Sequence, residues 1–120
     1  MVNKYHAVKT GHSASKKEAR RKRELERLEA AGLIHGLQCQ VPFELIPVQR
    51  EPQIVGPRGG KKPGKLIEHS CVYVADFVYF KNGQQIVEDV KGYKGGQAYA
   101  LFVVKRKLML FRYGIRIKEV

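Results

Sequence analysis

The sequence predicts a single α/β domain, and three observations lead to that prediction. Two alternating apolar runs form a candidate hairpin over residues 72–91, a helical pattern free of proline precedes it at 15–31, and a second helical pattern follows it at 97–113. A chain of 120 residues is long enough for one hydrophobic core and too short for two. We therefore expect one domain over residues 1–120, with the order helix, strand, hairpin, helix, strand around a mixed central sheet.

The first helix is expected to begin at Ser15, because Ser15-Lys-Lys-Glu18 has the form of a capping box, and to run for about four to five turns. Glu18 lies seven residues before the apolar Leu25, which places the two side chains about 20° apart around the helix. Glu18 therefore points toward the core side, as the reciprocal half of the capping box, as part of a functional site, or as both. Residues 1–13 are expected to form a mobile basic arm.

A strand is expected over residues 37–48, where Pro42 and Pro47 favour an edge position or a bulge. The next segment, 49–65, holds three prolines, four glycines and five basic side chains. We expect a flexible basic loop that tracks DNA, since long loops in compact domains are often functional. A surface connection whose lysines only maintain solubility is the alternative.

The hairpin carries the main functional signal. Asn82-Gly83 is a strong signal for a two-residue type I′ turn, and counting outward from it places Asp76 opposite Asp89, with Lys91 two residues further along the same face. Like charges directly opposite each other destabilise a hairpin, whereas a hard divalent cation between the carboxylates would stabilise it. The pattern indicates a cation site, and two solvated carboxylates beside a lysine are the alternative.

The second helix is expected to end at Gly114 and to be followed by a strand over residues 115–120. Lys105 falls within its apolar stripe, so its ammonium group must reach solvent or a partner. The carboxylate site is one possible partner, and the exposed end of the stripe is the other. The stripe itself consists of five apolar residues: Ala98, Leu101, Phe102, Leu108 and Met109.

The charge of the chain favours a polyanionic partner. Its 23 lysines and arginines outnumber 11 aspartates and glutamates, giving a net charge of +12. Nucleic acid is the first candidate, since no long apolar segment or lipidation signal indicates a membrane. Without an apolar secretory signal, we expect a cytoplasmic protein. The candidate DNA contacts are Lys16, Lys17, Arg20, Arg21, Arg58, Lys61, Lys62, Lys94 and Lys105.

The order of elements, with an acid on the first helix, an acid on the second strand and Asp-x-Lys on the third, resembles the PD-(D/E)XK nuclease core, the restriction-endonuclease-like fold. Asp76 matches the first aspartate of that motif and Asp89-Val90-Lys91 its (D/E)-x-K element. Glu18 resembles the helix-borne glutamate of Holliday junction resolvases. Short segments along nearly the whole chain are also similar to a family of small phage-encoded PD-(D/E)XK proteins: 15–19, 38–47, 75–79, 87–92 and 105–108.

The resemblance implies a metal-dependent endodeoxyribonuclease. Asp76, Asp89, the backbone carbonyl of Val90 and Glu18 would hold Mg²⁺ or Mn²⁺, and Lys91 would position the nucleophile or stabilise developing negative charge. The expected catalytic residues are thus Glu18, Asp76, Asp89 and Lys91. Strand alternation directs Glu88 to the opposite sheet face, outside this set.

The expected substrate is branched DNA, cut as by Holliday junction resolvases, and symmetrical cutting would require a homodimer with two sites. If the chain is phage-encoded, it would act in the cytoplasm of the bacterial host. A nicking or flap nuclease is compatible with the same residues. Two different classes of protein also fit the sequence: a non-catalytic nucleic-acid-binding protein and a metal-dependent hydrolase of small phosphorylated substrates.

Overall fold

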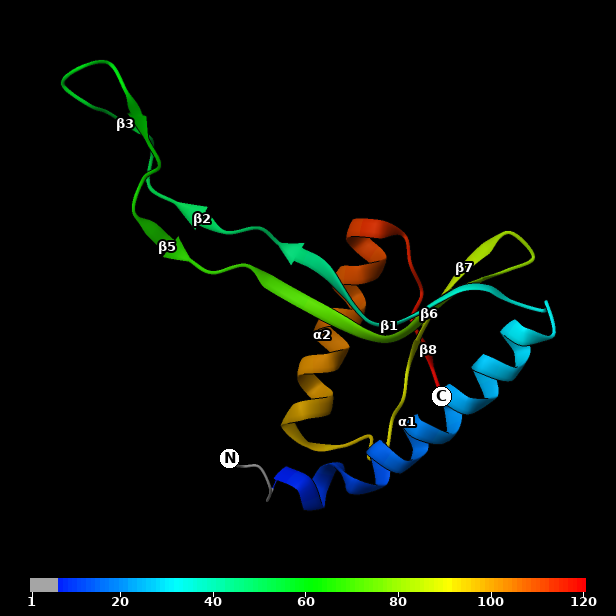
Figure 1. The fold of residues 1–120 in the computed structure, drawn as a ribbon. Coiled ribbons are helices and arrows are strands. Elements are labelled where there is room, and N and C mark those ends of the chain that lie inside the picture. Colours follow the sequence, from blue (N-terminus) through cyan, green and yellow to red (C-terminus); the bar gives the residue numbers. More distant parts are fainter. Residues whose placement is uncertain (1–6) are drawn as a thin grey trace.

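The structure is a computed structural model that describes residues 7–120, with side chains from residue 15 onward. A four-stranded mixed sheet in the order β1-β6-β7-β8 forms the body together with two helices (Figure 1). Within this sheet, β7 and β8 pair parallel, and the other neighbouring strands pair antiparallel. The predicted mixed α/β class is confirmed, with the elements α1 (Ala7–Ala30), β1 (His35–Ile46), β6 (Cys71–Lys81), β7 (Gln84–Asp89), α2 (Gly96–Tyr113) and β8 (Lys118–Glu119).

Helix α1 begins earlier than the sequence predicted. It starts at Ala7, so Ser15 lies inside the helix and the capping-box interpretation is wrong. Each residue added to an existing helix gains a backbone hydrogen bond, and one internal glycine such as Gly11 costs only about 1 kcal/mol relative to alanine. The part of the expected arm that is described, residues 7–13, therefore belongs to α1, and residues 1–6 lie outside the described part of the chain.

The hairpin has the predicted turn and register. Asn82 and Gly83 have φ values of 51° and 78°, the left-handed values that a type I′ turn requires at both positions. Pairing runs from Lys81 opposite Gln84 to Phe77 opposite Glu88. The next pair in this register is Asp76 with Asp89.

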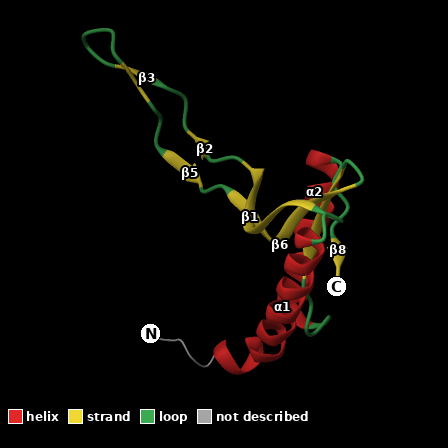
Figure 2. Cartoon of the chain, turned by 45° about the vertical axis from the view of Figure 1, so that its right-hand side comes forward, coloured by secondary structure: helices red, strands yellow, loops and turns green. Residues whose placement is uncertain are grey.

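Strand β1 is an edge strand, as its prolines predicted, and it pairs antiparallel with β6. Beyond the body, the segment that connects β1 to β6 forms a narrow two-stranded ribbon, which projects away from both helices (Figures 1 and 2). We call residues 49–68 the arm. The flexible loop expected over 49–65 thus contains paired strands, β2 (Gln49–Arg50) with β5 (Leu66–Glu68) and β3 (Ile54–Val55) with β4 (Lys61–Lys62).

Gly64 permits this close strand pairing in the arm. A Cβ atom at Gly64 would lie 1.8 Å from the carbonyl oxygen of Glu51, so no side chain fits there. The neighbouring residue Lys65 accepts a 2.8 Å hydrogen bond from the Glu51 N–H. The glycine that suggested a loop in the sequence serves here as a point of close backbone approach.

Two core clusters show that the helices pack on opposite faces of the sheet. Phe102 and Met109 of α2 pack in a cluster with Tyr73 and Ala75 of β6 and with residues of β1 and β7. On the other face, Leu25 of α1 packs with Ile34, Phe77, Tyr79 and Val90. Asp76 therefore lies at the point along β6 where the packing partner changes from α2 to α1.

Helix α2 buries a narrower stripe than the sequence predicted. Phe102 and Met109 are buried, whereas Ala98 is exposed and Leu101 is 57% exposed. Leu108 is partly buried and packs against the same core cluster as Phe102 and Met109. Gly114 ends the helix as predicted, in a left-handed conformation with φ of 67°. Neither helix in the described part of the chain is long and apolar enough to span a membrane.

Candidate active site

Four predicted site residues converge from three segments of the chain. Glu18 comes from α1, Asp76 from β6, Asp89 from the end of β7, and Lys91 follows two residues later. The side chain of Gln40, on β1, joins two of them: its Nε2 donates to Glu18 Oε2 at 2.9 Å and to Asp76 Oδ1 at 3.3 Å. We call Glu18, Asp76, Asp89 and Lys91 the carboxylate cluster.

Asp89 and Lys91 are held together on the side of α2. The Lys91 ammonium forms an ion pair with Asp89 Oδ2 and lies 3.5 Å from the centroid of the Phe102 ring. The Tyr73 hydroxyl donates a 2.8 Å hydrogen bond to Asp89 Oδ1. The backbone N–H of Lys91 donates to the carbonyl of Val120 at 2.9 Å, which fixes the main chain at this point. Lys91 is thus a positioned lysine and not a freely moving one.

Asp76 is oriented by the residue that directly follows β7. Its Oδ2 accepts a 2.8 Å hydrogen bond from the backbone N–H of Val90. Burial raises the pKa of Asp76, the charge of Asp89 raises it further, and the Val90 N–H offsets part of the increase. The resemblance implied the Val90 carbonyl as a metal ligand, and in the structure Val90 contacts the cluster through its N–H.

The cluster carries more negative than positive charge. Burial raises the pKa of Glu18, and the charges of Asp76 and Asp89 raise it further. Three carboxylates thus face one ammonium group in a chain whose net charge is +12. A bound cation would relieve this repulsion, so the donor set fits a hard, oxygen-binding ion such as Mg²⁺.

The present arrangement is that of a cluster held by hydrogen bonds. Among the described side chains, no group of three or more histidine, cysteine, aspartate or glutamate residues is placed so that it could hold a metal ion. The amide nitrogen of Gln40 lies between Glu18 and Asp76, where it donates to both carboxylates. Binding a cation would therefore require this amide to turn or to move.

Glu88 lies on the opposite face, as strand alternation predicted. It is fully buried and accepts hydrogen bonds from Arg21 Nε at 2.9 Å and from Arg21 Nη2 at 2.7 Å. The Tyr79 hydroxyl also donates to it. Burial opposes ionisation of Glu88, but the hydrogen bonds from Arg21 and Tyr79 outweigh it and lower its pKa.

Several predicted DNA contacts have protein partners in the structure. The guanidinium of Arg21 binds Glu88, and Lys94 lies 3.6 Å from Glu119. Lys105, which was predicted as a partner of the carboxylates or of solvent, donates to the Val72 carbonyl at 3.0 Å and so ties α2 to β6. Lys17 donates to the backbone carbonyl of Lys91 at 2.8 Å, at the margin of the cluster. Seven members of the predicted set are exposed: Lys16, Lys17, Arg20, Arg58, Lys61, Lys62 and Lys94.

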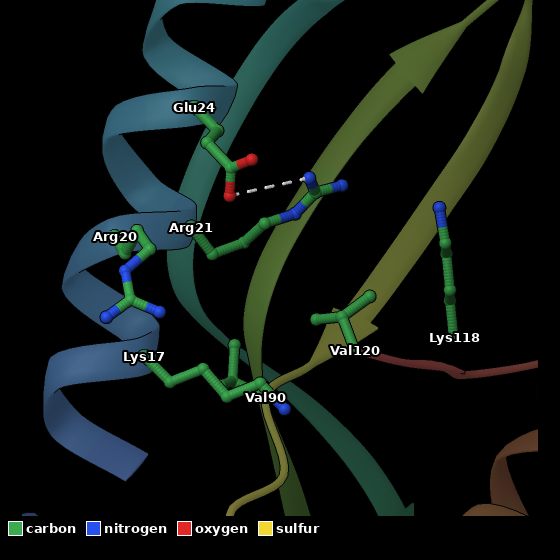
Figure 3. A pocket seen from close by; sticks show the side chains of 7 residues that line it. All are labelled: Lys17, Arg20, Arg21, Glu24, Val90, Lys118 and Val120. Atoms are coloured by element: carbon green, nitrogen blue, oxygen red, sulfur yellow. Dashed lines mark ion pairs between the residues drawn. The ribbon is translucent and has the colours of Figure 1, made fainter. Parts of the chain in front are cut away.

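A basic hollow of about 290 Å³ lies between α1 and the C-terminal segment. Figure 3 shows Lys17 and Arg20 on the helix side and Lys118 across from them, with Val90 and Val120 between. Arg21 also lines the hollow, 4.0 Å from Glu24.

The side chain of Val90 packs with α1, on the face of the sheet that also holds Glu88 and Arg21. The hollow therefore lies on the α1 face, whereas Asp89 and Lys91 contact Tyr73 and Phe102 on the α2 face. Lys17, which lines the hollow, connects the two through its hydrogen bond to the Lys91 carbonyl.

The sequence did not indicate Gln40, Tyr73 or Phe102 as site residues. Gln40 was an ordinary polar residue of an edge strand. Its backbone is left-handed, with φ of 53°, and no sequence signal comparable to Asn-Gly indicates this. Tyr73 and Phe102 were apolar core positions, and their contacts with Asp89 and Lys91 depend on how α2 packs on the sheet. Of these two aromatic residues, Tyr73 has a polar group, and its hydroxyl, three residues before Asp76, was the one sequence feature that could have indicated a contact with the site.

The fold is mixed α/β, and it places the carboxylate cluster where the packing partner of β6 changes from α2 to α1. The chain belongs to the family described as "Protein of unknown function (DUF1064)", whose model matches residues 2–118. No curated protein and no solved structure matches the chain.

Proposed function

We propose that this protein is a Mg²⁺-dependent or Mn²⁺-dependent endodeoxyribonuclease with a restriction-endonuclease-like core. The observation that carries the proposal is the convergence of Glu18, Asp76, Asp89 and Lys91 from α1, β6 and β7. Carboxylates that repel one another beside a positioned lysine suit a cation site that acts on phosphate. The resemblance to the PD-(D/E)XK core assigns the same four residues.

Each residue of the cluster has a role in phosphodiester hydrolysis. Asp76 and Asp89 would hold the cation, and Glu18 would complete its ligand set or orient a water. When bound, such a cation polarises the phosphate and makes a water molecule more acidic. Lys91 would stabilise the negative charge that develops on the phosphate oxygens, and its contacts with Asp89 and Phe102 hold it in place for that purpose.

The distribution of basic residues supports a DNA substrate. Lys17 and Arg20 lie on α1 and face Lys118 across the basic hollow, and Lys16 is exposed on the same helix. Arg58, Lys61 and Lys62 extend the basic surface along the arm. Neutralising backbone phosphates with such side chains gives binding that depends little on sequence and strongly on salt.

Branched DNA is the proposed substrate class, with a homodimer supplying two sites for symmetrical cutting. Phosphate contacts of exposed lysines and arginines carry no direct sequence information, which favours recognition of DNA shape. The arm offers a projecting basic element that could engage a second duplex. A nicking or flap nuclease would use the same cluster on a different DNA structure.

The test is cleavage of end-labelled four-way junction, flap and linear duplex DNA in Mg²⁺, Mn²⁺ or EDTA. Asp76→Asn is the informative variant because it keeps the size of the side chain while removing the charge. We expect metal-dependent cutting by the wild type and at least about a hundredfold loss in Asp76→Asn, since the substitution removes a cation ligand. DNA binding should be largely kept.

Glu26→Gln is the matched control, because Glu26 is an exposed carboxylate on the same helix as Glu18. It should cut like the wild type. Equal activity of Asp76→Asn and the wild type would refute the proposed site. Salt-sensitive DNA binding without cutting in any metal would instead favour the non-catalytic nucleic-acid-binding protein, which the charge of +12 also supports.

A further inference from the structure

We propose that Gln40 is an oxygen ligand of the cation site, reached by a half-turn of its side-chain amide. The proposal rests on the proposed function, since it concerns the cation held by Asp76 and Glu18. It adds a residue from a fourth element, β1, that neither the sequence pattern nor the nuclease resemblance assigned.

The backbone at Gln40 is unusual in a way that serves the site. Its φ of 53° is left-handed, a region that residues with a Cβ atom rarely adopt. The neighbouring pairs Cys39 with Phe77 and Val41 with Ala75 keep the β1–β6 register on both sides. Gln40 thus stands opposite Asp76 in a local distortion that the strands around it tolerate. Strained backbone of this kind is concentrated at functional sites.

The distortion places the Gln40 amide between two carboxylates. Glu18 Oε2 and Asp76 Oδ1 can only accept hydrogen bonds when ionised, so the amide must present its NH₂ group to them. The partial positive charge of that group offsets part of the repulsion between the carboxylates. In the absence of a cation, the NH₂ group therefore takes over part of the cation's electrostatic role.

A cation at this position would reverse the preference of the amide. An NH₂ group facing a cation is repelled, whereas the Oε1 atom of the same amide is a good ligand for a hard ion. The terminal torsion of glutamine is broad and roughly two-fold, so the two orientations interchange without moving the backbone. Gln40 is also exposed, which leaves the amide room to turn and an ion room to enter.

The test measures cation binding directly, by calorimetric titration of the full chain with Mn²⁺ and with Ca²⁺, alongside its melting temperature in EDTA. Gln40→Met keeps the length of the side chain and removes both amide atoms. We expect it to weaken Mn²⁺ binding at least about tenfold, as the loss of a supporting group at a metal site typically does. Gln40→Gly should weaken binding similarly while keeping the left-handed backbone, and it guards against misfolding of the methionine variant.

Gln40→Glu distinguishes two roles of Gln40, a ligand of the cation and a hydrogen-bond donor that only separates the two carboxylates. The glutamate side chain presents an oxygen to the cation in either orientation of its carboxylate group. We expect tighter Mn²⁺ binding together with a lower melting temperature in EDTA, since a third carboxylate then faces Glu18 and Asp76 without a donor between them. Opposite changes in the two measurements support the proposal.

Unchanged or tighter Mn²⁺ binding in both Gln40→Met and Gln40→Gly would overturn the role of Gln40. If Asp76→Asn loses binding in the same experiment, the proposed function stands and only the Gln40 inference falls. If the wild type binds neither cation, both fall together.

Discussion

At the scale of single residues, the neighbours Glu88 and Asp89 lie on opposite faces of the sheet and have different partners. Asp89 meets Tyr73 and Lys91 on the side of α2, whereas Glu88 is enclosed by Arg21 and Tyr79 on the side of α1. A buried carboxylate needs such partners to remain charged. Glu88 therefore belongs to the connection between α1 and the sheet, and Asp89 to the carboxylate cluster.

Replacing Glu88 tests this division. Glu88→Gln should lower the free energy of unfolding by about 2 kcal/mol, because Arg21 and Tyr79 lose a charged hydrogen-bond partner. Assayed below its melting temperature, the variant should keep metal-dependent cleavage, since the carboxylates on the other face are unchanged. Urea denaturation at neutral pH measures the first effect, with Glu26→Gln as the control. Loss of cleavage in a folded Glu88→Gln would instead place Glu88 in the site.

The stabilisation from Glu88 should depend on pH in a defined direction. Its pKa in the folded protein lies below the ordinary value of 4.5, so its contribution is fully present above that value. The contribution is lost as the pH falls through the lower, folded pKa. The difference in unfolding free energy between wild type and Glu88→Gln should therefore shrink below about pH 4.5. A difference that grew in acid would contradict the assigned ion pair.

At the scale of elements, helix α1 shows how a local start signal can lie inside a longer helix. Ser15-Lys-Lys-Glu18 has the residues of a capping box, yet the backbone is helical from Ala7. The side chain of Glu18 instead reaches Gln40 on β1. Tertiary contact with the edge strand thus gives Glu18 the partner that a cap would have supplied.

Ser15→Ala distinguishes the two positions of the helix start. Removal of a true N-cap serine costs about 1 kcal/mol, whereas alanine is the better residue in a helix interior. We expect Ser15→Ala to leave the melting temperature unchanged or slightly raised, measured by circular dichroism at 222 nm, the usual helix signal. A destabilisation of about 1 kcal/mol would restore Ser15 as the cap.

The secondary structure of the arm could not be predicted from its amino-acid composition. Its prolines and glycines indicated a loop, whereas in the structure β2 pairs with β5 and β3 with β4, so that the arm continues the antiparallel pair β1–β6. Ile54 and Val55 are 60% and 66% exposed, so packing against the body does not hold the arm in place. Its strands are held by pairing with each other.

At the scale of the whole molecule, the charge is divided between a negative cluster and a positive remainder. The carboxylate cluster lies in a chain with 23 basic residues, many of them on α1 and the arm. The basic surface attracts a polyanion, and the carboxylate cluster attracts a cation to one part of that surface. The arm extends this positive surface beyond the body, and the longest dimension of the molecule is 60 Å.

Charge reversal in the arm tests its part in DNA binding. Replacing Lys61 and Lys62 together by glutamate should lower the slope of log affinity against log salt by about 0.9 for each phosphate that the variant no longer neutralises. Stability should change by less than about 0.5 kcal/mol, because both side chains are exposed. The control is the double variant Lys81→Glu and Lys107→Glu, which changes the net charge by the same amount at two exposed positions outside the arm. An unchanged slope would remove the arm from the DNA interface.

The sequence by itself determined the hairpin, its type I′ turn and the register that sets Asp76 opposite Asp89, because these depend on residues close together in the chain. It also determined the end of α2 at Gly114 and the edge position of β1. Glu18 was placed on the correct side of α1 by helical spacing alone.

Only the tertiary structure decided the start of α1, the paired strands of the arm, and the contacts of Gln40, Arg21 and Lys105. Each of these contacts joins residues far apart in sequence, and their geometry depends on how two helices pack against opposite faces of one sheet. The left-handed backbone of Gln40 is the clearest case. No local preference of glutamine favours that conformation, and the strand pairs on either side, together with its two carboxylate partners, hold it there.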